Sequence, residues 1–176
     1  MTTTAPTGAP PPARPRYENW RPPIVGVSLL APVGANGLVL ADVTGHGYYV
    51  LPHGTVDDGQ TPEDAARAVL AGQATIRRQV AVINTQGRRR RITTHLVVTD
   101  PLNPHDIARL DYQDPRAVLR VLPTPQAIAA LPPRASEWAL LGLQALAIGV
   151  LPHLENGAVK RLEAVAVTHG CNRSLE

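Results

Sequence analysis

The chain has 176 residues, of which 44% are hydrophobic, and a formal net charge of +3. This length and composition predict one globular domain with its own apolar core, and the small charge excess argues against nucleic acid as the partner. The single cysteine, Cys171, excludes an internal disulfide and a cysteine-rich zinc site, which is typical of a cytoplasmic protein.

Both ends of the chain are expected to lie outside the folded domain. Residues 1–18 are rich in Thr, Ala and Pro and lack the basic start and apolar centre of a signal peptide, so they predict a disordered tail. Residues 19–170 are expected to form the domain, and residues 171–176 to fray. The longest apolar stretch, Trp138–Leu151, is shorter than the ~20 residues of a membrane span, so no membrane contact is expected.

The strands are expected in two hairpins. Apolar, β-branched runs separated by glycine-containing turns occupy residues 24–32 and 38–43 in the first hairpin, and 79–84 and 91–99 in the second. Residues 48–51 resume extended structure between the two hairpins.

The helices are expected at four places. The first begins with Thr61 as N-cap and Pro62 at the first helical position, and runs to Leu70 or Ala71. The others are expected at residues 125–131, at 136–150 with Ser136 as N-cap, and at 156–167. The order strands, helix, strands, helix predicts an α/β (α+β) fold with a mixed sheet between helices.

The segment from Leu51 to Ile76, LPHGTVDDGQTPEDAARAVLAGQATI, resembles the Nudix box. That loop–helix–loop motif has the pattern G-x5-E-x7-R-E-U-x-E-E-x-G-U, where U is aliphatic. Gly54 matches the opening glycine, and Leu70 and Ile76 match the two aliphatic positions. The resemblance implies a Nudix-like α/β/α sandwich with a C-terminal helix.

The departures from the motif fall on its metal-binding half. Neutral residues replace the charged residues of the pattern, namely Gln60, Ala68, Val69, Gly72 and Gln73, and Thr75 replaces the closing glycine. In the family, carboxylates one turn apart on this helix hold Mg²⁺, which needs hard oxygen ligands and activates the attacking water. The resemblance therefore implies a non-hydrolytic binding or regulatory protein that holds a nucleotide-like small ligand or a protein partner, without cofactor or metal.

Two alternatives stay open. In the first, the chain is a Mg²⁺-dependent hydrolase of a nucleoside diphosphate derivative whose catalytic acids have moved to Asp57, Asp58 and Glu63. Loop solubility and helix capping explain the same acids without a metal. In the second, the chain is a structural or assembly partner with a vestigial cleft.

The candidate ligand-binding residues lie in the box and in two arginine segments. They are His53, Gly54, Arg67, Gln73, Arg77, Arg78, Arg88 and Arg90. If residues 79–84 and 91–99 pair, Arg77 and Arg78 are expected near the run Arg88–Arg91, where six guanidinium groups could grip phosphate or an acidic partner. The alternative for the run is a solvated hairpin tip that keeps a sheet edge soluble.

The helix expected at 136–150 is apolar around most of its circumference. One face must pack on the sheet, so the remainder predicts a second buried contact with another helix or another subunit. A homodimer is one form of that prediction.

Overall fold

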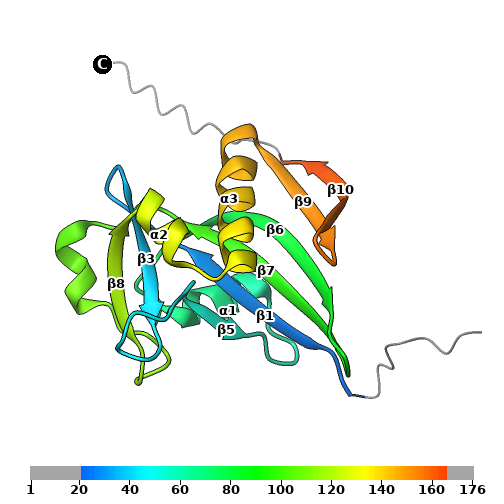
Figure 1. Ribbon diagram of the computed structural model, residues 1–176, viewed down its shortest axis with the longest axis horizontal. Helices are drawn as coiled ribbons and strands as arrows, with labels where there is room; N and C mark the ends of the chain where they lie inside the picture. The colour runs from blue at the N-terminus through cyan, green and yellow to red at the C-terminus, as the bar shows by residue number, and fades with distance from the viewer. Residues whose placement is uncertain (1–20, 166–176) are drawn as a thin grey trace, which may run out of the picture.

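The computed structural model describes residues 21–165 (Figure 1). The expected tail at 1–18, the frayed end at 171–176 and Cys171 lie outside the described residues, as do the expected domain limits, 19 and 170. Within residues 21–165 the chain forms two β-sheets and three α-helices.

The larger sheet, called sheet A, has six strands in the order β10-β9-β6-β7-β1-β5. The strands are β1 Ile24–Leu30, β5 His53–Thr55, β6 Ile76–Gln86, β7 Arg91–Thr99, β9 Val150–Glu155 and β10 Ala158–Ala164. The pairs β1–β7 and β6–β9 are parallel and the others antiparallel, so the sheet is mixed. The predicted second hairpin is confirmed as β6 and β7.

The smaller sheet, sheet B, corrects the first predicted hairpin. Its strands are β2 Pro32–Val33, β3 Gly37–Asp42, β4 Tyr49–Val50 and β8 Val118–Pro123. The run expected as one strand at 24–32 is divided, because β1 pairs in sheet A whereas β2 pairs with β3 in sheet B. The chain changes sheets at Ala31, whose carbonyl still accepts a hydrogen bond from Val39 N–H (3.0 Å).

Helices cover both faces of sheet A (Figure 1). The helix α1, Pro62–Val69, packs on the face that carries Val27 and Val97, and α3, Pro133–Ile148, packs on the opposite face. Gly142 lets α3 approach closely, since a Cβ there would lie 2.6 Å from Leu30 Cδ1 and 2.6 Å from Leu96 Cδ2. The helix α2, Thr124–Ala130, packs against sheet B and α3. The predicted α/β/α sandwich is confirmed.

The C-terminal elements differ from the prediction in two ways. The helix expected from Ser136 begins at Pro133, because Ser136 N–H already donates to the carbonyl of Pro132 (2.9 Å) and lies inside the first turn. The helix expected at 156–167 is wrong. Asn156 and Gly157 adopt positive φ (51° and 87°) and form the turn between β9 and β10, a conformation favoured by Asn-Gly in hairpins.

The second contact predicted for α3 is partly supplied within the chain. The helix contacts both sheet A and α2, while Ile148 on its outer side remains 71% exposed. The homodimer stays a prediction. In the described part of the chain, no helix combines the length and the hydrophobicity that a bilayer crossing requires.

Candidate functional site

The helix of the box ends before the positions of its second carboxylate pair. Thr61 caps α1 as predicted, its side chain accepting a hydrogen bond from Asp64 N–H (3.1 Å). The helix stops at Val69, and then Ala71 and Gly72 adopt positive φ (49° and 76°). Gln73 therefore follows a left-handed turn instead of lying one helical turn beyond Val69.

A segment of the chain nearly 40 residues away fastens onto this turn. The segment, residues 109–113, is called the strap. Gln73 binds it through both ends of its amide: Oε1 accepts from Asp111 N–H (2.7 Å) and Nε2 donates to the Arg109 carbonyl (3.2 Å). Gln113 N–H donates to the carbonyl of Val69 (3.2 Å). The strap thus binds the last carbonyl of α1, that of Val69, and both ends of the Gln73 amide.

The strap also fills the space in front of Gly54. A Cβ on Gly54 would lie 2.7 Å from Gln113 Nε2 and 3.1 Å from Val69 Cγ2. The Gln113 amide donates a hydrogen bond to the carbonyl of His53. The groups that meet at the opening glycine of the box are therefore a neutral amide and an aliphatic side chain.

The residues present do not fit a magnesium ion. Mg²⁺ requires oxygen ligands, chiefly carboxylates, in near-octahedral geometry, and no group of three or more His, Cys, Asp or Glu side chains in residues 21–165 could hold a metal. Asp57 and Asp58 are exposed in the loop before α1, and Glu63 lies in the first turn of α1. None of these three candidate acids belongs to a group of described side chains that could hold a metal.

An open pocket of about 640 Å³ lies beside the strap. Strands β1, β5 and β7 supply one side, and residues 112–116 supply the other. In β1, Gly26 pairs with Thr55 and Thr94, and Ser28 pairs with His53, so small and hydroxyl-bearing residues from three strands share one face. This volume lies within the range of small-molecule sites, roughly 300–1,000 Å³.

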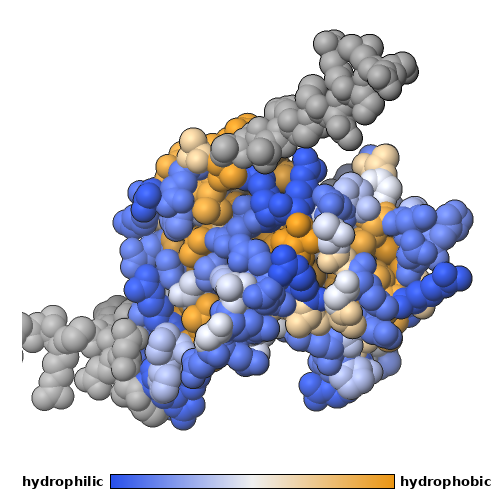
Figure 2. Space-filling view, turned by 180° about the vertical axis from the view of Figure 1, so that it is seen from behind, coloured by the Kyte–Doolittle hydropathy of each residue, from blue (hydrophilic) through white to orange (hydrophobic). Residues whose placement is uncertain are grey.

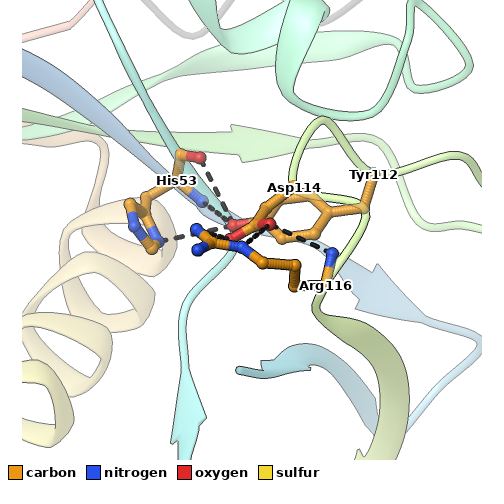
Figure 3. Close-up of polar contacts among 4 residues, drawn as sticks. All are labelled: His53, Tyr112, Asp114 and Arg116. Atoms are coloured by element: carbon orange, nitrogen blue, oxygen red, sulfur yellow. Dashed lines mark hydrogen bonds and ion pairs between the residues drawn. The ribbon is translucent and has the colours of Figure 1, made fainter. Parts of the chain in front are cut away.

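An ion pair lies on the loop side of the pocket (Figure 3). Arg116 Nε is 3.1 Å from Asp114 Oδ1, and a terminal nitrogen of Arg116 is 3.4 Å from Oδ2. The Arg116 side chain lowers the pKa of the Asp114 carboxyl, and the carboxylate raises the pKa of Arg116. The Arg116 side chain is 86% exposed, so the carboxylate orients a guanidinium that solvent still reaches.

His53 is held in place by two neighbours (Figure 3 shows Tyr112 beside it). Its Nδ1 lies 3.0 Å from the carbonyl oxygen of Leu51 and 3.5 Å from the Tyr112 hydroxyl. Its backbone N–H donates to the Tyr112 hydroxyl (3.3 Å), and burial raises the pKa of that hydroxyl. The His53 ring therefore lies at the pocket between the Leu51 carbonyl and the Tyr112 hydroxyl.

The structure separates the predicted ligand-binding residues. His53 and Gly54 line the pocket. Arg67 pairs with Asp64 (2.6 Å) on the exposed side of α1, and Gln73 is bound to the strap. The remaining four are the arginines Arg77, Arg78, Arg88 and Arg90, all outside the pocket lining.

The expected cluster of six arginines is wrong. Arg78 pairs with Val98 at one end of the β6–β7 hairpin, whereas Gln86 pairs with Arg91 at the other. The eight-residue difference in β6 corresponds to about 26 Å at ~3.3 Å per residue. Arg78 instead binds the C-terminal end of α3, donating to the carbonyls of Ala145 (2.8 Å), Leu146 (3.1 Å) and Val150 (3.3 Å).

Sequence reasoning missed the loop side of the site. Tyr112, Gln113, Asp114 and Arg116 fall in a proline-rich stretch that predicts only a connection. A weak signal exists at Asp114-Pro115, a dipeptide that favours a turn. A second signal is Ser28, the polar residue in the otherwise apolar strand IVGVSLL.

No protein-family model and no curated protein match the sequence. The structure is similar to the solution structure of the ORF135 protein of E. coli, with 20% identity and a TM-score of 0.54, over 71% of this chain and 91% of that one. It is also similar to the crystal structure of a NUDIX hydrolase from Nitrosomonas europaea, with 16% identity and a TM-score of 0.53, over 77% and 79% of the two chains. The strand order, the covering helices and these similarities together show that the chain has the Nudix fold.

Proposed function

We propose that this chain is a non-hydrolytic binding protein that holds a small anionic, nucleotide-like ligand in the pocket between β1, β5 and residues 112–116. The observation that carries the proposal is the contrast between two neighbouring regions. The strap closes the degenerate box with neutral groups, through Gln73 and Gln113. The pocket beside it remains open, with a volume of about 640 Å³.

The pocket offers groups that suit a phosphate and an attached polar body. Arg116 has five N–H donors, and its contacts with Asp114 leave the remainder for a ligand oxygen. His53 Nε2 and the hydroxyls of Ser28, Thr55 and Thr94 add polar contacts. Ile24 and Pro115 supply apolar surface for a ring or sugar.

Hydrolysis is not expected, because the side chains that meet at the box offer no carboxylate for a metal, and residues 21–165 hold no group of side chains that could bind one. Metal-assisted hydrolysis needs an ion that polarises the phosphoryl oxygen and lowers the pKa of bound water. Gly54, Val69 and Gln113 meet where the box is closed, and none carries a negative charge. Ligand retention without turnover is therefore the expected behaviour.

The experiment is a thermal-shift and calorimetric screen of nucleoside mono-, di- and triphosphates, with Mg²⁺ or with EDTA, combined with chromatography for products. A ligand that binds only the folded state raises its stability by mass action. We expect equal stabilisation in Mg²⁺ and EDTA, with no product. Arg116→Gln should weaken binding about tenfold, the loss of one charged hydrogen bond. The matched control is Arg120→Gln, an exposed arginine outside the pocket.

Two results would contradict the proposal. Mg²⁺-dependent product formation that is lost in Asp57→Ala or Glu63→Ala would instead support a hydrolase with relocated acids. The absence of stabilisation by every compound in the screen would leave the assembly role as the remaining hypothesis.

A further inference from the structure

One end of sheet A carries arginines that have no carboxylate partner within residues 21–165. Arg67, Arg116 and Arg161, elsewhere in the fold, each lie within 2.6–3.1 Å of a carboxylate oxygen. At this end, four arginines make no ion pair with any described residue; they are Arg88, Arg90, Arg91 and Arg134. The acidic side chains that line the two hollows at this end are Glu137 and Glu155, so the four guanidinium groups outnumber them.

The turn between β6 and β7 holds Arg88 and Arg90, Arg91 begins β7, and Arg134 lies at the start of α3. Gly87 N–H donates to the Arg90 carbonyl (2.9 Å) and closes the β6–β7 turn. Gln86 N–H donates to Asn156 Oδ1 (2.8 Å), which fastens that turn to the one between β9 and β10. In Figure 1 the β6–β7 tip is the lower right corner of the molecule, beyond the β9–β10 turn. Figure 2 shows mainly hydrophilic residues over the same end, at the lower left.

A groove of about 550 Å³ opens between these turns and the start of α3. Trp138 supplies an aromatic wall, Arg134 and Glu137 lie on the helix side, and Gln86 and Asn156 lie on the strand side. A smaller hollow of about 60 Å³ shares Gln86 and Asn156 and is lined by Arg91 and Glu155. Arg134 therefore borders a groove that contains one large flat side chain and two amides, and Arg91 borders the smaller hollow that shares both amides. Arg88 and Arg90 lie on the adjoining turn between β6 and β7.

We propose that this end of sheet A binds single-stranded nucleic acid, and that it does so independently of the pocket beside the strap. Guanidinium groups along a rim bind successive phosphates, and an aromatic side chain stacks on an unpaired base. The groove beside Trp138 accepts such a base, and Arg88, Arg90 and Arg91 follow the backbone. Glu137 lies inside the groove, where it repels phosphate and accepts hydrogen bonds from base amino groups.

These features favour a single strand over a duplex or an acidic peptide. In a duplex the bases are stacked, so none can enter the groove. An acidic peptide would engage the rim but would leave the Trp138 wall unused. The overall charge argued against nucleic acid as a partner, but it gave no information on how that charge is distributed over the surface.

The test is fluorescence anisotropy of labelled twelve-nucleotide oligo(U) and oligo(dT) with the full chain, over a series of salt concentrations. We expect the chain to bind both single strands. The triple variant Arg88→Gln, Arg90→Gln, Arg91→Gln should bind them at least tenfold more weakly. The slope of log affinity against log salt concentration should fall by about 0.7 for each phosphate that the variant no longer binds. The matched control removes three exposed arginines elsewhere, Arg77, Arg109 and Arg120, by the same change. Its affinity should remain within twofold of the unmodified chain.

A second readout examines the groove directly. The chain has two tryptophans, so Trp20→Phe leaves Trp138 as the single indole fluorophore. Oligo(U) should quench its emission, because stacking brings a base onto the ring. The proposal is overturned if the triple variant and control bind alike, if poly-glutamate or duplex competes as well as the single strand, or if Trp138 emission does not change. If nucleotides still stabilise the triple variant, the pocket beside the strap binds its ligand independently of the arginines, and the two proposals are tested separately.

Discussion

Replacing Arg78 with methionine would remove the guanidinium that binds the C-terminal end of α3. Its three acceptors are the carbonyls of Ala145, Leu146 and Val150, at 2.8–3.3 Å. The carbonyls of Ala145 and Leu146 lie in the last turn of α3, at the negative end of the helix dipole, which a cation stabilises. Partial burial lowers the pKa of Arg78, yet the guanidinium remains charged.

The expected cost follows from the hydrogen bonds that methionine cannot make. A hydrogen bond to a charged group contributes about 1.5–3 kcal/mol, and in the variant the Ala145 carbonyl keeps its hydrogen bond from Gly149 N–H (3.1 Å). We therefore expect Arg78→Met to lower the free energy of unfolding by about 2–3 kcal/mol, equivalent to roughly 5–10 °C in Tm for a domain of this size. Arg78→Lys should recover part of this loss, because it restores the charge but not the planar array of donors.

The assay is urea denaturation followed by circular dichroism, with Arg77→Met as the control. Arg77 is the exposed neighbour on the same strand and should change stability by less than about 0.5 kcal/mol. If the two variants were equally stable, the interaction with α3 would not contribute to stability and the reasoning would be wrong. A ligand affinity that changed in Arg78→Met without any change in stability would instead restore Arg78 as a binding residue.

Three further predictions concern packing, capping and pH. Gly142→Ala should cost about 1–3 kcal/mol by overpacking against Leu30 and Leu96, measured by urea denaturation. Thr61→Ala should cost about 1 kcal/mol by removing the N-cap of α1, with Thr61→Ser as the control that retains the hydroxyl. Burial lowers the pKa of His95 in the folded chain below its ordinary value of 6.5. The unfolded chain therefore binds more protons than the folded chain, and the free energy of unfolding should fall as the pH drops below 6.5. NMR titration should find the folded-state pKa below 6.5, and a His95→Gln variant should show a flatter stability profile between about pH 7 and pH 5.

Much of the fold follows from local sequence patterns. The start of α1 at Thr61 and Pro62 and the β6–β7 hairpin could be predicted because they depend on capping, proline geometry and hydrophobic alternation over a few residues. The turn at Asn156-Gly157 carried a local signal that the helical pattern of residues 156–167 obscured. The division of the first strand at Ala31 carried only one local signal, Pro32, which cannot donate to a strand ladder, because the residues on both sides of Ala31 are largely apolar.

The candidate site likewise has one part that the sequence predicts and another part that only the tertiary structure shows. The sequence alone shows that neutral residues stand at the charged positions of the box, since identity at a motif position requires no coordinates. It also placed His53 and Gly54 beside the cleft. The partners on residues 112–116 depend on interactions between segments about 60 residues apart in the chain, which local patterns do not specify.

The arginines illustrate why only the tertiary structure could decide the remainder. From sequence, Arg78 and Arg88 are equivalent cations that are expected in one cluster. The structure directs Arg78 to the carbonyls at the end of α3 and leaves Arg88 at an open tip. The composition of the chain thus determined which charges are available. Strand register and helix packing determined which of them are used within the fold and which remain for a ligand, because a side chain's partners are set by what folding brings beside it.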